Sequence, residues 1–210
     1  MSTLKKLITE FFYDAGLATK ALHFLPLTGM ETQEILENEH ISYVSFIGNA
    51  DIGWKIRKLV RPGVKVMLEH GGTAAAILDK NANIDNALPS VVRGAFYHSG
   101  QVCVSTQILY VHDEIYEKIK PNLIDRIANL VVGDACSEVT DCGPLITPAV
   151  VNKMETLVDD AIQNAGKILV GGKRLSNNCF EPTMIENISN EMLVYNEEIF
   201  GPLLCLKKYN

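Results

Sequence analysis

The chain has 210 residues, of which 47% are hydrophobic and 21% charged, and its formal net charge is −6. This composition is typical of a folded protein and excludes an intrinsically disordered one, and the length fits one large domain or two small ones. The net negative charge argues against a nucleic-acid partner, because such binding depends on neutralising phosphates. The longest apolar runs span about five to seven residues, far fewer than the roughly 20 that cross a bilayer, so we expect no membrane partner.

Cysteine and histidine usage bears on the redox compartment and on metals. The chain has five cysteines and five histidines, with no CxxC pair and no HxxxH pattern. An odd number of dispersed cysteines is typical of free thiols in a reducing compartment, so we expect a cytoplasmic protein without disulfides. The cysteines and histidines nowhere show the spacing of metal ligands, so we expect no metal site. The cysteines are Cys103, Cys136, Cys142, Cys179 and Cys205.

Helix-like and strand-like patterns alternate along the chain. In chain order they predict a helix at 4–15, a strand at 22–25, a helix at 31–38, a strand at 43–47, a helix at 54–60, strands at 64–68, 74–78 and 107–111, helices at 114–131 and 148–165, and strands at 168–170, 183–185 and 203–206. This alternation predicts an α/β fold with a largely parallel sheet. We expect the boundary between two structural units at the adjacent Gly71 and Gly72.

A glycine-bounded turn at 48–53 follows a predicted strand and leads into a predicted helix. Glycines let the backbone approach a phosphate at such a turn, and a helix N-terminus offers N–H donors and a favourable dipole. The segment lacks the GxGxxG spacing of the usual dinucleotide fingerprint. By itself it is therefore more often a structural turn than a phosphate site.

Two residues carry the candidate chemistry. Cys103 follows Ser99, Gly100 and Gln101, and this polar turn favours an accessible thiol over a small buried one. We also expect Cys103 at a helix N-terminus, which favours the thiolate. Glu69 ends an apolar strand, where a carboxylate is functional or is simply exposed at the strand end. Together they indicate a thiol nucleophile and a base that directs water at the resulting thioester.

Four motifs, in order along the chain, resemble those of the aldehyde dehydrogenase superfamily. The matching segments are 46–53 for F-T-G-S-x-x-x-G, 68–72 for L-E-L-G-G, 100–103 for G-Q-x-C and 197–202 for E-E-I-F-G-P. Ile47 and Asn49 depart from the first motif. The resemblance covers essentially the whole chain.

The resemblance implies an aldehyde dehydrogenase-like α/β fold. Residues 1–72 would be the C-terminal part of a Rossmann-type NAD(P)-binding domain, and residues 73–210 the first part of the catalytic domain. Family members are much longer and form homo-oligomers, so we expect a fragment or truncated reading frame that lacks the oxyanion-hole Asn and the first cofactor-domain strands. We expect the isolated chain to bind dinucleotide poorly, to have impaired activity and to self-associate through exposed sheet edges.

The resemblance also implies an activity, the oxidation of a small-molecule aldehyde to a carboxylic acid with NAD or NADP. Cys103 would be the nucleophile, and Glu69 the general base that activates water. Glu198 would hold the nicotinamide ribose, and Phe200 would pack near the nicotinamide. The remaining cofactor contacts that the resemblance implies are Gly29, Gly48, Asn49 and Gly53.

Two alternatives stay open. The chain could be a non-catalytic remnant that acts as an interaction or structural protein. It could also be a cysteine hydrolase that pairs Cys103 with His98 or His70, which needs an imidazole within hydrogen-bond reach of the thiol. His98 lies only five positions before Cys103, whereas such partners usually come from distant segments. We expect the other four cysteines to be structural.

Overall fold

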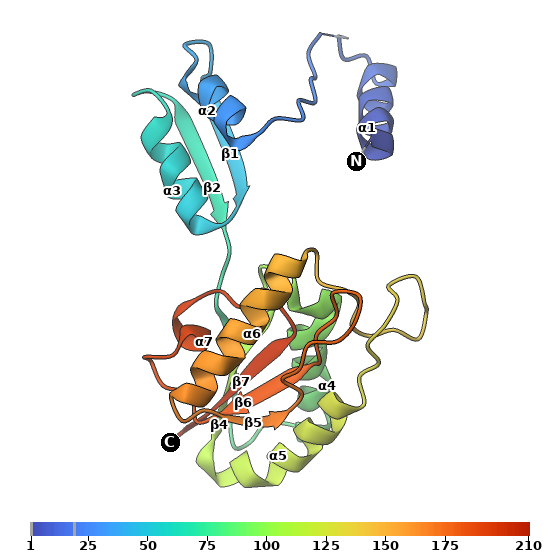
Figure 1. Ribbon diagram of the computed structural model, residues 1–210, viewed down its shortest axis with the longest axis vertical. Helices are drawn as coiled ribbons and strands as arrows, with labels where there is room; N and C mark the ends of the chain where they lie inside the picture. The colour runs from blue at the N-terminus through green and yellow to red at the C-terminus, as the bar shows by residue number, and fades with distance from the viewer. Residues whose placement is uncertain (1, 19) are drawn as a thin grey trace. The chain divides into compact units, whose positions relative to one another are not determined.

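Helices and strands alternate along the chain and gather into two separate units (Figure 1). The computed structural model describes residues 2–18 and 20–210. The first unit is Met1–Glu69 and the second is His70–Asn210. The α/β class predicted from the sequence is confirmed.

In the first unit, two helices precede a strand–helix–strand segment. The elements are α1 (Ser2–Asp14), α2 (Gly29–Glu37), β1 (Tyr43–Gly48), α3 (Ala50–Leu59) and β2 (Lys65–His70). β1 and β2 pair in a two-stranded sheet. The predicted strand at 22–25 is wrong, because this segment has no regular structure and Leu25 is 59% exposed. An apolar run forms a strand only beside a partner, and no strand of the described residues pairs with this one.

Helix α3 begins at Ala50, earlier than the predicted helix at 54–60. The reason is Asn49, whose side-chain oxygen accepts the N–H of Asp51 at 2.8 Å and so caps the helix. This cap satisfies one of the N–H groups that a helix start leaves unpaired. Gly53 consequently lies inside the helix, where it is buried, and not in a turn before it.

A five-stranded sheet forms the centre of the second unit, in the order β3-β4-β7-β6-β5. The pairs β3–β4, β4–β7 and β6–β7 are parallel, whereas β5 runs antiparallel to β6. The largely parallel sheet predicted from the sequence is therefore confirmed. The strands are β3 (Ala74–Leu78), β4 (Thr106–His112), β5 (Lys167–Val170), β6 (Thr183–Glu186) and β7 (Leu203–Tyr209).

Helices cover both faces of this sheet, which gives the second unit three layers (Figure 1). The helical elements are α4 (Ile84–Phe96), the 3₁₀ turn η1 (Tyr97–Gly100), α5 (Asp113–Ala128), α6 (Pro148–Gln163) and α7 (Leu193–Asn196). Helices α4 and α5 share one hydrophobic cluster and α6 belongs to another. Strand side chains alternate between the clusters, as in β4, where Leu109 joins the first and Ile108 the second. Among the described residues, no helix is long and apolar enough to span a membrane.

Helix α4 has no counterpart among the predicted elements. Pro89 lies inside it, and a proline removes one intrahelical hydrogen bond, which argues against a helix when the sequence is read alone. Leu88, Val92 and Phe96 are nevertheless buried along one face at helical spacing. Asn83 caps the helix by accepting the N–H of Asn86 at 3.2 Å. The stabilisation from burying the apolar face therefore outweighs the cost of the hydrogen bond that Pro89 removes.

A buried carboxylate joins α5 to the sheet. Glu186, in β6, is 5% exposed and accepts hydrogen bonds from the Tyr116 hydroxyl at 3.0 Å and the Lys120 ammonium at 3.2 Å, with the Lys167 ammonium also 3.2 Å away. Burial, the largest single influence, raises the pKa of Glu186, but the hydrogen bonds from Lys120, Lys167 and Tyr116 together lower it below the usual 4.5. The ionised carboxylate therefore stabilises the folded unit.

We expect Glu186→Gln to lower the free energy of unfolding by about 1–3 kcal/mol at neutral pH, because it weakens buried, charge-assisted hydrogen bonds. Folding lowers the pKa of Glu186, so its stabilising contribution is present above pH 4.5 and is lost as the pH falls through the folded value. Denaturant unfolding at neutral pH and at about pH 3 measures this loss.

The matched control is Glu155→Gln, which removes an exposed ion pair with Arg174. Such pairs contribute little, so this variant should unfold almost like the wild type. A Glu186→Gln effect of the same size at both pH values would contradict the assignment.

Candidate active site

Three segments that are far apart in the sequence meet at one edge of the five-stranded sheet. Each lies just before a strand, with Gly72 ahead of β3, Cys103 ahead of β4 and Gly201 ahead of β7. These strands are parallel neighbours, so their first residues lie at the same edge. Sheet topology thus brings together parts of the motifs at 68–72, 100–103 and 197–202.

Direct contacts join these segments. The N–H of Gly72 donates to Glu198 Oε1 at 3.1 Å. A Cβ atom on Gly72 would lie 3.1 Å from the carbonyl oxygen of Cys103, and one on Gly71 would overlap the Glu198 carboxylate. Gly71 must therefore be a glycine for the carboxylate to lie against the backbone.

The chain just before Cys103 turns through consecutive left-handed residues, His98 at φ 50°, Ser99 at φ 56° and Gly100 at φ 69°. Non-glycine residues rarely adopt this conformation, and such strain is concentrated at functional sites. The Ser99 hydroxyl holds the turn by donating to the Gly143 carbonyl at 2.8 Å. Gly100 lies so close to the Gly201 carbonyl that a Cβ atom would overlap it.

Cys103 lies in the tight turn that follows, where the N–H of Ser105 donates to the Val102 carbonyl at 2.9 Å. Its side chain is exposed, so the expectation of an accessible thiol is confirmed. The expected place at a helix N-terminus is wrong, because residues 101–105 form no helix. The left-handed residues end helical structure before the thiol is reached.

Gln107 is a residue that the sequence analysis missed. It is 2% exposed, and its Nε2 donates to the Gly72 carbonyl at 2.8 Å while its Oε1 accepts the N–H of Ile199 at 3.0 Å. One side-chain amide therefore bridges the segment before β3 and the segment before β7. The sequence offered one signal for this role, a polar amide at the start of an apolar strand. An amide that is buried there needs hydrogen-bond partners.

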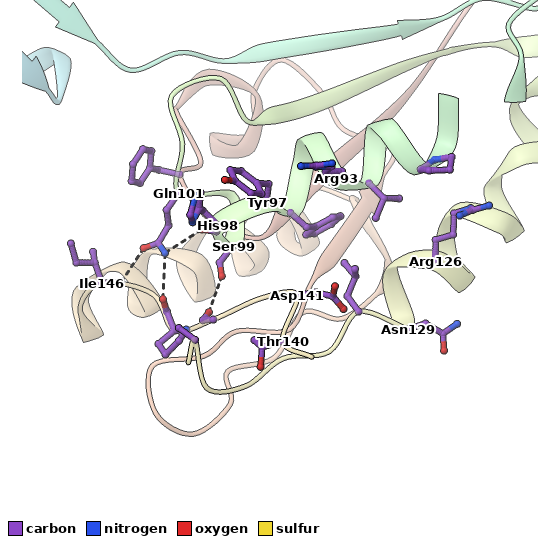
Figure 2. A pocket seen from close by; sticks show the side chains of 18 of the residues that line it. Arg93, Tyr97, His98, Ser99, Gln101, Arg126, Asn129, Thr140, Asp141 and Ile146 are labelled. Atoms are coloured by element: carbon purple, nitrogen blue, oxygen red, sulfur yellow. Dashed lines mark hydrogen bonds between the residues drawn. The ribbon is translucent and has the colours of Figure 1, made fainter. Parts of the chain in front are cut away.

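Gln101 ties the Cys103 turn to a neighbouring loop (Figure 2). Its Oε1 accepts the N–H of Ile146 at 2.9 Å, and its Nε2 lies 3.4 Å from both the Pro144 and His98 carbonyls. The turn and loop border a cavity of about 1150 Å³, which Phe200 also lines. Figure 2 shows Tyr97, His98 and Gln101 on one side of it and Thr140 and Asp141 on the other.

Glu198 and Phe200 occupy adjacent places on the loop before β7. Glu198 is half-buried, and its backbone carbonyl accepts a hydrogen bond from the Lys153 ammonium at 2.6 Å. Phe200 has a left-handed backbone at φ 51° and is 36% exposed. The loop thus presents a carboxylate and an aromatic ring from a fixed backbone.

The other predicted site residues belong to the first unit and are described there by themselves. Glu69 is exposed in β2. Gly48 ends β1, Asn49 caps α3, Gly53 is buried within α3, and Gly29 is the first residue of α2. Their predicted roles stay predictions.

The His98 ring packs edge-on against the Tyr97 ring, with centroids 4.0 Å apart. In the described part of the chain, no hydrogen bond joins the His98 ring to Cys103. No observation therefore favours a hydrolase that uses His98 as its base.

The remaining thiols differ in accessibility. Burial raises the pKa of the Cys142 thiol to about 12 and that of Cys205 to about 12, and it also raises the pKa of Cys179. Cys136 is exposed, like Cys103. Burial thus leaves Cys103 and Cys136 as the two accessible thiols.

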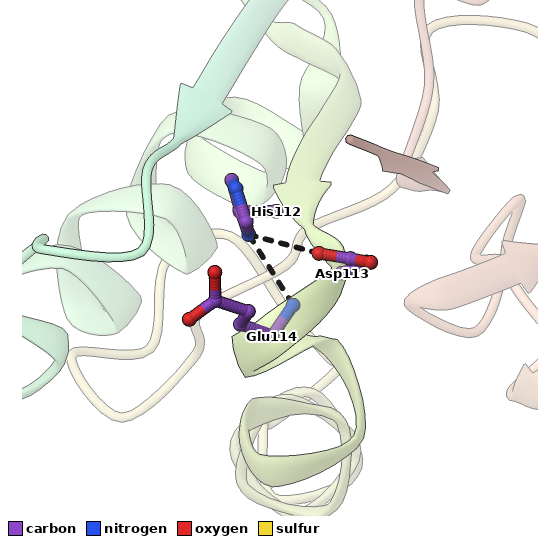
Figure 3. A group of neighbouring side chains, drawn as sticks. All are labelled: His112, Asp113 and Glu114. Carbon is purple, nitrogen blue, oxygen red and sulfur yellow. Dashed lines mark hydrogen bonds and ion pairs between the residues drawn. The ribbon is translucent and has the colours of Figure 1, made fainter.

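One cluster has the composition of a metal site. The ligand atoms of His112, Asp113 and Glu114 lie within 4.8 Å of one another (Figure 3). His112 Nδ1 accepts the N–H of Glu114 at 3.3 Å and thereby caps α5. Acidic residues in a first helical turn stabilise the helix dipole. Helix capping explains the cluster, and the expected lack of a metal site stays a prediction.

Comparison with known proteins identifies relatives along the whole chain. The sequence model of the aldehyde dehydrogenase family matches residues 2–210. A 3-sulfolactaldehyde dehydrogenase from Priestia aryabhattai is 34% identical over 205 residues, which are 97% of this chain and 42% of the relative. The mitochondrial succinate-semialdehyde dehydrogenase of Arabidopsis thaliana is 35% identical over 204 residues, 95% of this chain and 39% of the relative.

Solved structures agree with the sequence relatives. The betaine aldehyde dehydrogenase of Staphylococcus aureus in complex with NAD+ matches with a TM-score of 0.90 and 29% identity, over 96% of this chain and 41% of that one. The succinate-semialdehyde dehydrogenase of Burkholderia pseudomallei matches with a TM-score of 0.88 and 30% identity, over 94% of this chain and 42% of that one. The chain thus spans about two fifths of the length of the relatives it matches.

We expect Gln107→Ala to destabilise the second unit by about 1–3 kcal/mol, because the Gly72 carbonyl and the Ile199 N–H lose their partner. Hydrogen exchange followed by mass spectrometry should show faster exchange at Ile199. Gln101→Ala serves as the control, since it disturbs the loop at Ile146 and leaves the Gln107 bridge intact. Unchanged exchange at Ile199 in the Gln107 variant would refute the bridging role.

Brief treatment with a limiting thiol reagent should label Cys103 and Cys136 before the other three thiols, because these two are exposed. Cys142 and Cys205 should react only after unfolding, because burial raises the pKa of each to about 12. Peptide mass spectrometry after quenching measures the order, and a denatured sample provides the control in which all five thiols react. Early labelling of a buried cysteine would count against the described packing.

Proposed function

Because this chain belongs to the aldehyde dehydrogenase family, we propose that the complete protein oxidises an aldehyde to a carboxylic acid through a covalent intermediate on Cys103. One observation carries the proposal. The exposed Cys103 turn, the glycines that follow Glu69 in the chain, and the Glu198 loop converge at one sheet edge. A nucleophile beside a carboxylate-bearing loop suits covalent chemistry on a bound carbonyl compound.

Cys103 begins the reaction as a thiolate. Its sulfur forms a bond to the aldehyde carbon while the carbonyl π pair moves to oxygen, giving a thiohemiacetal. The turn supports this role because it leaves the thiol exposed. Strained backbone at His98 and Ser99 fixes the approach to the turn.

The residues present fit a dinucleotide. At Gly71 the backbone lies directly against the Glu198 carboxylate, which a Cβ atom would displace. Glu198 uses Oε1 for the Gly72 N–H, so Oε2 remains to accept a ribose hydroxyl, and the exposed Phe200 ring offers a face to the nicotinamide. In the first unit by itself, the start of α3, with Gly48 and the capping Asn49, offers backbone N–H donors of the kind that bind a phosphate. A bound nicotinamide supplies the two-electron acceptor for the substrate carbon.

Glu69 completes the cycle as general base. Its carboxylate takes a proton from water as the water oxygen bonds to the thioester carbon, and the carbon–sulfur bond then breaks to release the acid and the Cys103 thiolate. The exposed strand-end position of Glu69 supports access to water.

The wider assignments follow from the same family membership. Residues 1–72 would be part of the cofactor-binding domain, residues 73–210 part of the catalytic domain, and the complete protein a cytoplasmic homo-oligomer. Both cofactors occur among similar proteins, since the Staphylococcus aureus structure holds NAD+ and a Picrophilus torridus relative is named for NADP+. The cofactor is therefore proposed as NAD or NADP.

In an active form of the protein, Glu69→Gln should preserve the first burst of reduced cofactor but slow steady turnover by about 10²–10⁴-fold, the usual contribution of a general base. An amide cannot accept the proton from water. Stopped-flow absorbance of reduced cofactor separates the two phases.

Two further variants serve as controls for this experiment. Cys103→Ser should abolish both burst and turnover, and Glu34→Gln, an exposed change in α2, should alter neither. Equal loss of both phases in Glu69→Gln would remove Glu69 from the hydrolytic step. Turnover that survives in Cys103→Ser would overturn the covalent mechanism.

A further inference from the structure

One peptide group in the loop before β7 is held from both sides by side chains of other elements. Its carbonyl belongs to Glu198 and accepts a hydrogen bond from the Lys153 ammonium of α6 at 2.6 Å. Its N–H belongs to the buried Ile199 and donates to Oε1 of Gln107 in β4 at 3.0 Å. The carbonyl and the N–H of a trans peptide point in opposite directions from one rigid plane. The two hydrogen bonds therefore fix the orientation of this peptide group.

The orientation of the peptide group bears directly on the Glu198 side chain, because both leave the same Cα atom. The Glu198 carboxylate accepts the N–H of Gly72 at 3.1 Å, and the Gly72 carbonyl accepts a hydrogen bond from Gln107 Nε2 at 2.8 Å. Glu198, Gly72, Gln107 and Ile199 thus form a closed ring of contacts. Lys153 supports this ring from α6, outside it.

Lys153 is suited to hold a backbone carbonyl. Its side chain is half-buried, and in the part of the chain that the structure describes no carboxylate forms an ion pair with its ammonium. A hydrogen bond from an ionised donor is roughly twice as strong as one between neutral groups. Lys153 therefore holds the Glu198 carbonyl more firmly than a neutral side chain would.

Helix α6 also supports the chain on either side of Glu198. Asp160 Oδ2 accepts the N–H of Leu193, the first residue of α7, at 2.7 Å. After Glu198, Gly201 lies so close to the Met154 side chain that a Cβ atom would overlap it. The helix itself is fixed, because it buries one face against the sheet (Figure 1). The contact from Lys153 is thus made by a rigid element.

We propose, on the basis of the function proposed above, that Lys153 is a positioning residue that directs the Glu198 carboxylate toward the cofactor ribose. Lys153 acts through the main chain, by holding the peptide group between Glu198 and Ile199. Without its ammonium only the Gln107 side of this group is held. The group then rotates, the carboxylate leaves the Gly72 N–H, and the cofactor loses an oriented acceptor.

Amide hydrogen exchange of the 210-residue chain, measured by NMR without cofactor, tests the positioning role. Lys153→Met keeps an unbranched apolar stem but removes the donor. The amides of Gly72 and Ile199 should exchange about tenfold faster in this variant, the effect of one charge-assisted hydrogen bond. The amides of the central strand β7 should keep their rates, because the sheet itself is unchanged.

Three further variants make this result specific. Lys153→Arg keeps a cationic donor and should restore the wild-type rates. Lys153→Gln removes the charge without adding apolar surface and should reproduce the methionine pattern, so a folding defect peculiar to methionine would be recognised. Lys118→Met, the same change at an exposed lysine of α5, should alter neither amide. Unchanged exchange at Gly72 in both neutral Lys153 variants, or acceleration spread evenly over β7, overturns the proposal.

A kinetic measurement separates this proposal from the proposed function. With NAD or NADP, an aldehyde and an active form of the protein, Lys153→Met should raise the cofactor KM about tenfold and change kcat by less than about twofold. Lys153→Arg should match the wild type. A cofactor KM that stays unchanged while Gly72 exchanges faster overturns the positioning role and keeps the dehydrogenase. Faster exchange at Gly72 without oxidation of any aldehyde keeps Lys153 as the support of Glu198 and refutes the dehydrogenase.

Discussion

The arrangement of the candidate site depends on the parallel pairing of β3, β4 and β7, which start at one edge of the sheet. Parallel strands need long crossover connections, so the segments that meet at these strand ends are distant in sequence. The buried Gln107 amide holds two of these segments together, because it donates a hydrogen bond to a carbonyl before β3 and accepts one from an N–H before β7. The candidate chemistry is therefore a property of the folded sheet and not of any single loop.

The close approach of the glycine backbone to neighbouring groups is the second constraint on the candidate site. Gly71 lies against the Glu198 carboxylate and Gly100 against the Gly201 carbonyl. Each glycine is so close to its neighbour that an added Cβ atom would overlap it. Left-handed residues at His98 and Ser99 direct the chain into the Cys103 turn. Such positions are strained and persist only where surrounding contacts hold them, which here include the Ser99 hydrogen bond to Gly143.

Much of the fold and part of the site could be predicted from the sequence. Apolar periodicity identified β3, β4 and β7, and the motifs lie directly before those strands, but the strand order that makes these three strands neighbours was not predicted. Helix α4 was missed although Leu88, Val92 and Phe96 recur at helical spacing. Pro89 does not account for the miss, because α5 was predicted with Pro121 inside it. The helix expected at Cys103 was wrong because the left-handed conformation of Ser99 depends on a tertiary contact. Gln107 was missed because its two partners lie in distant segments.

The close approach of Gly100 to Gly201 also makes the two loops a matched pair. A chimaera of two relatives with its crossover between Cys103 and Glu198 would inherit each loop from a different parent. Its strands could still pair, since strand pairing depends on backbone and alternating apolar residues. The facing loop surfaces would be complementary only if both parents share the same shape there. Productive recombination should therefore keep these segments in one block, however far apart they lie in the gene.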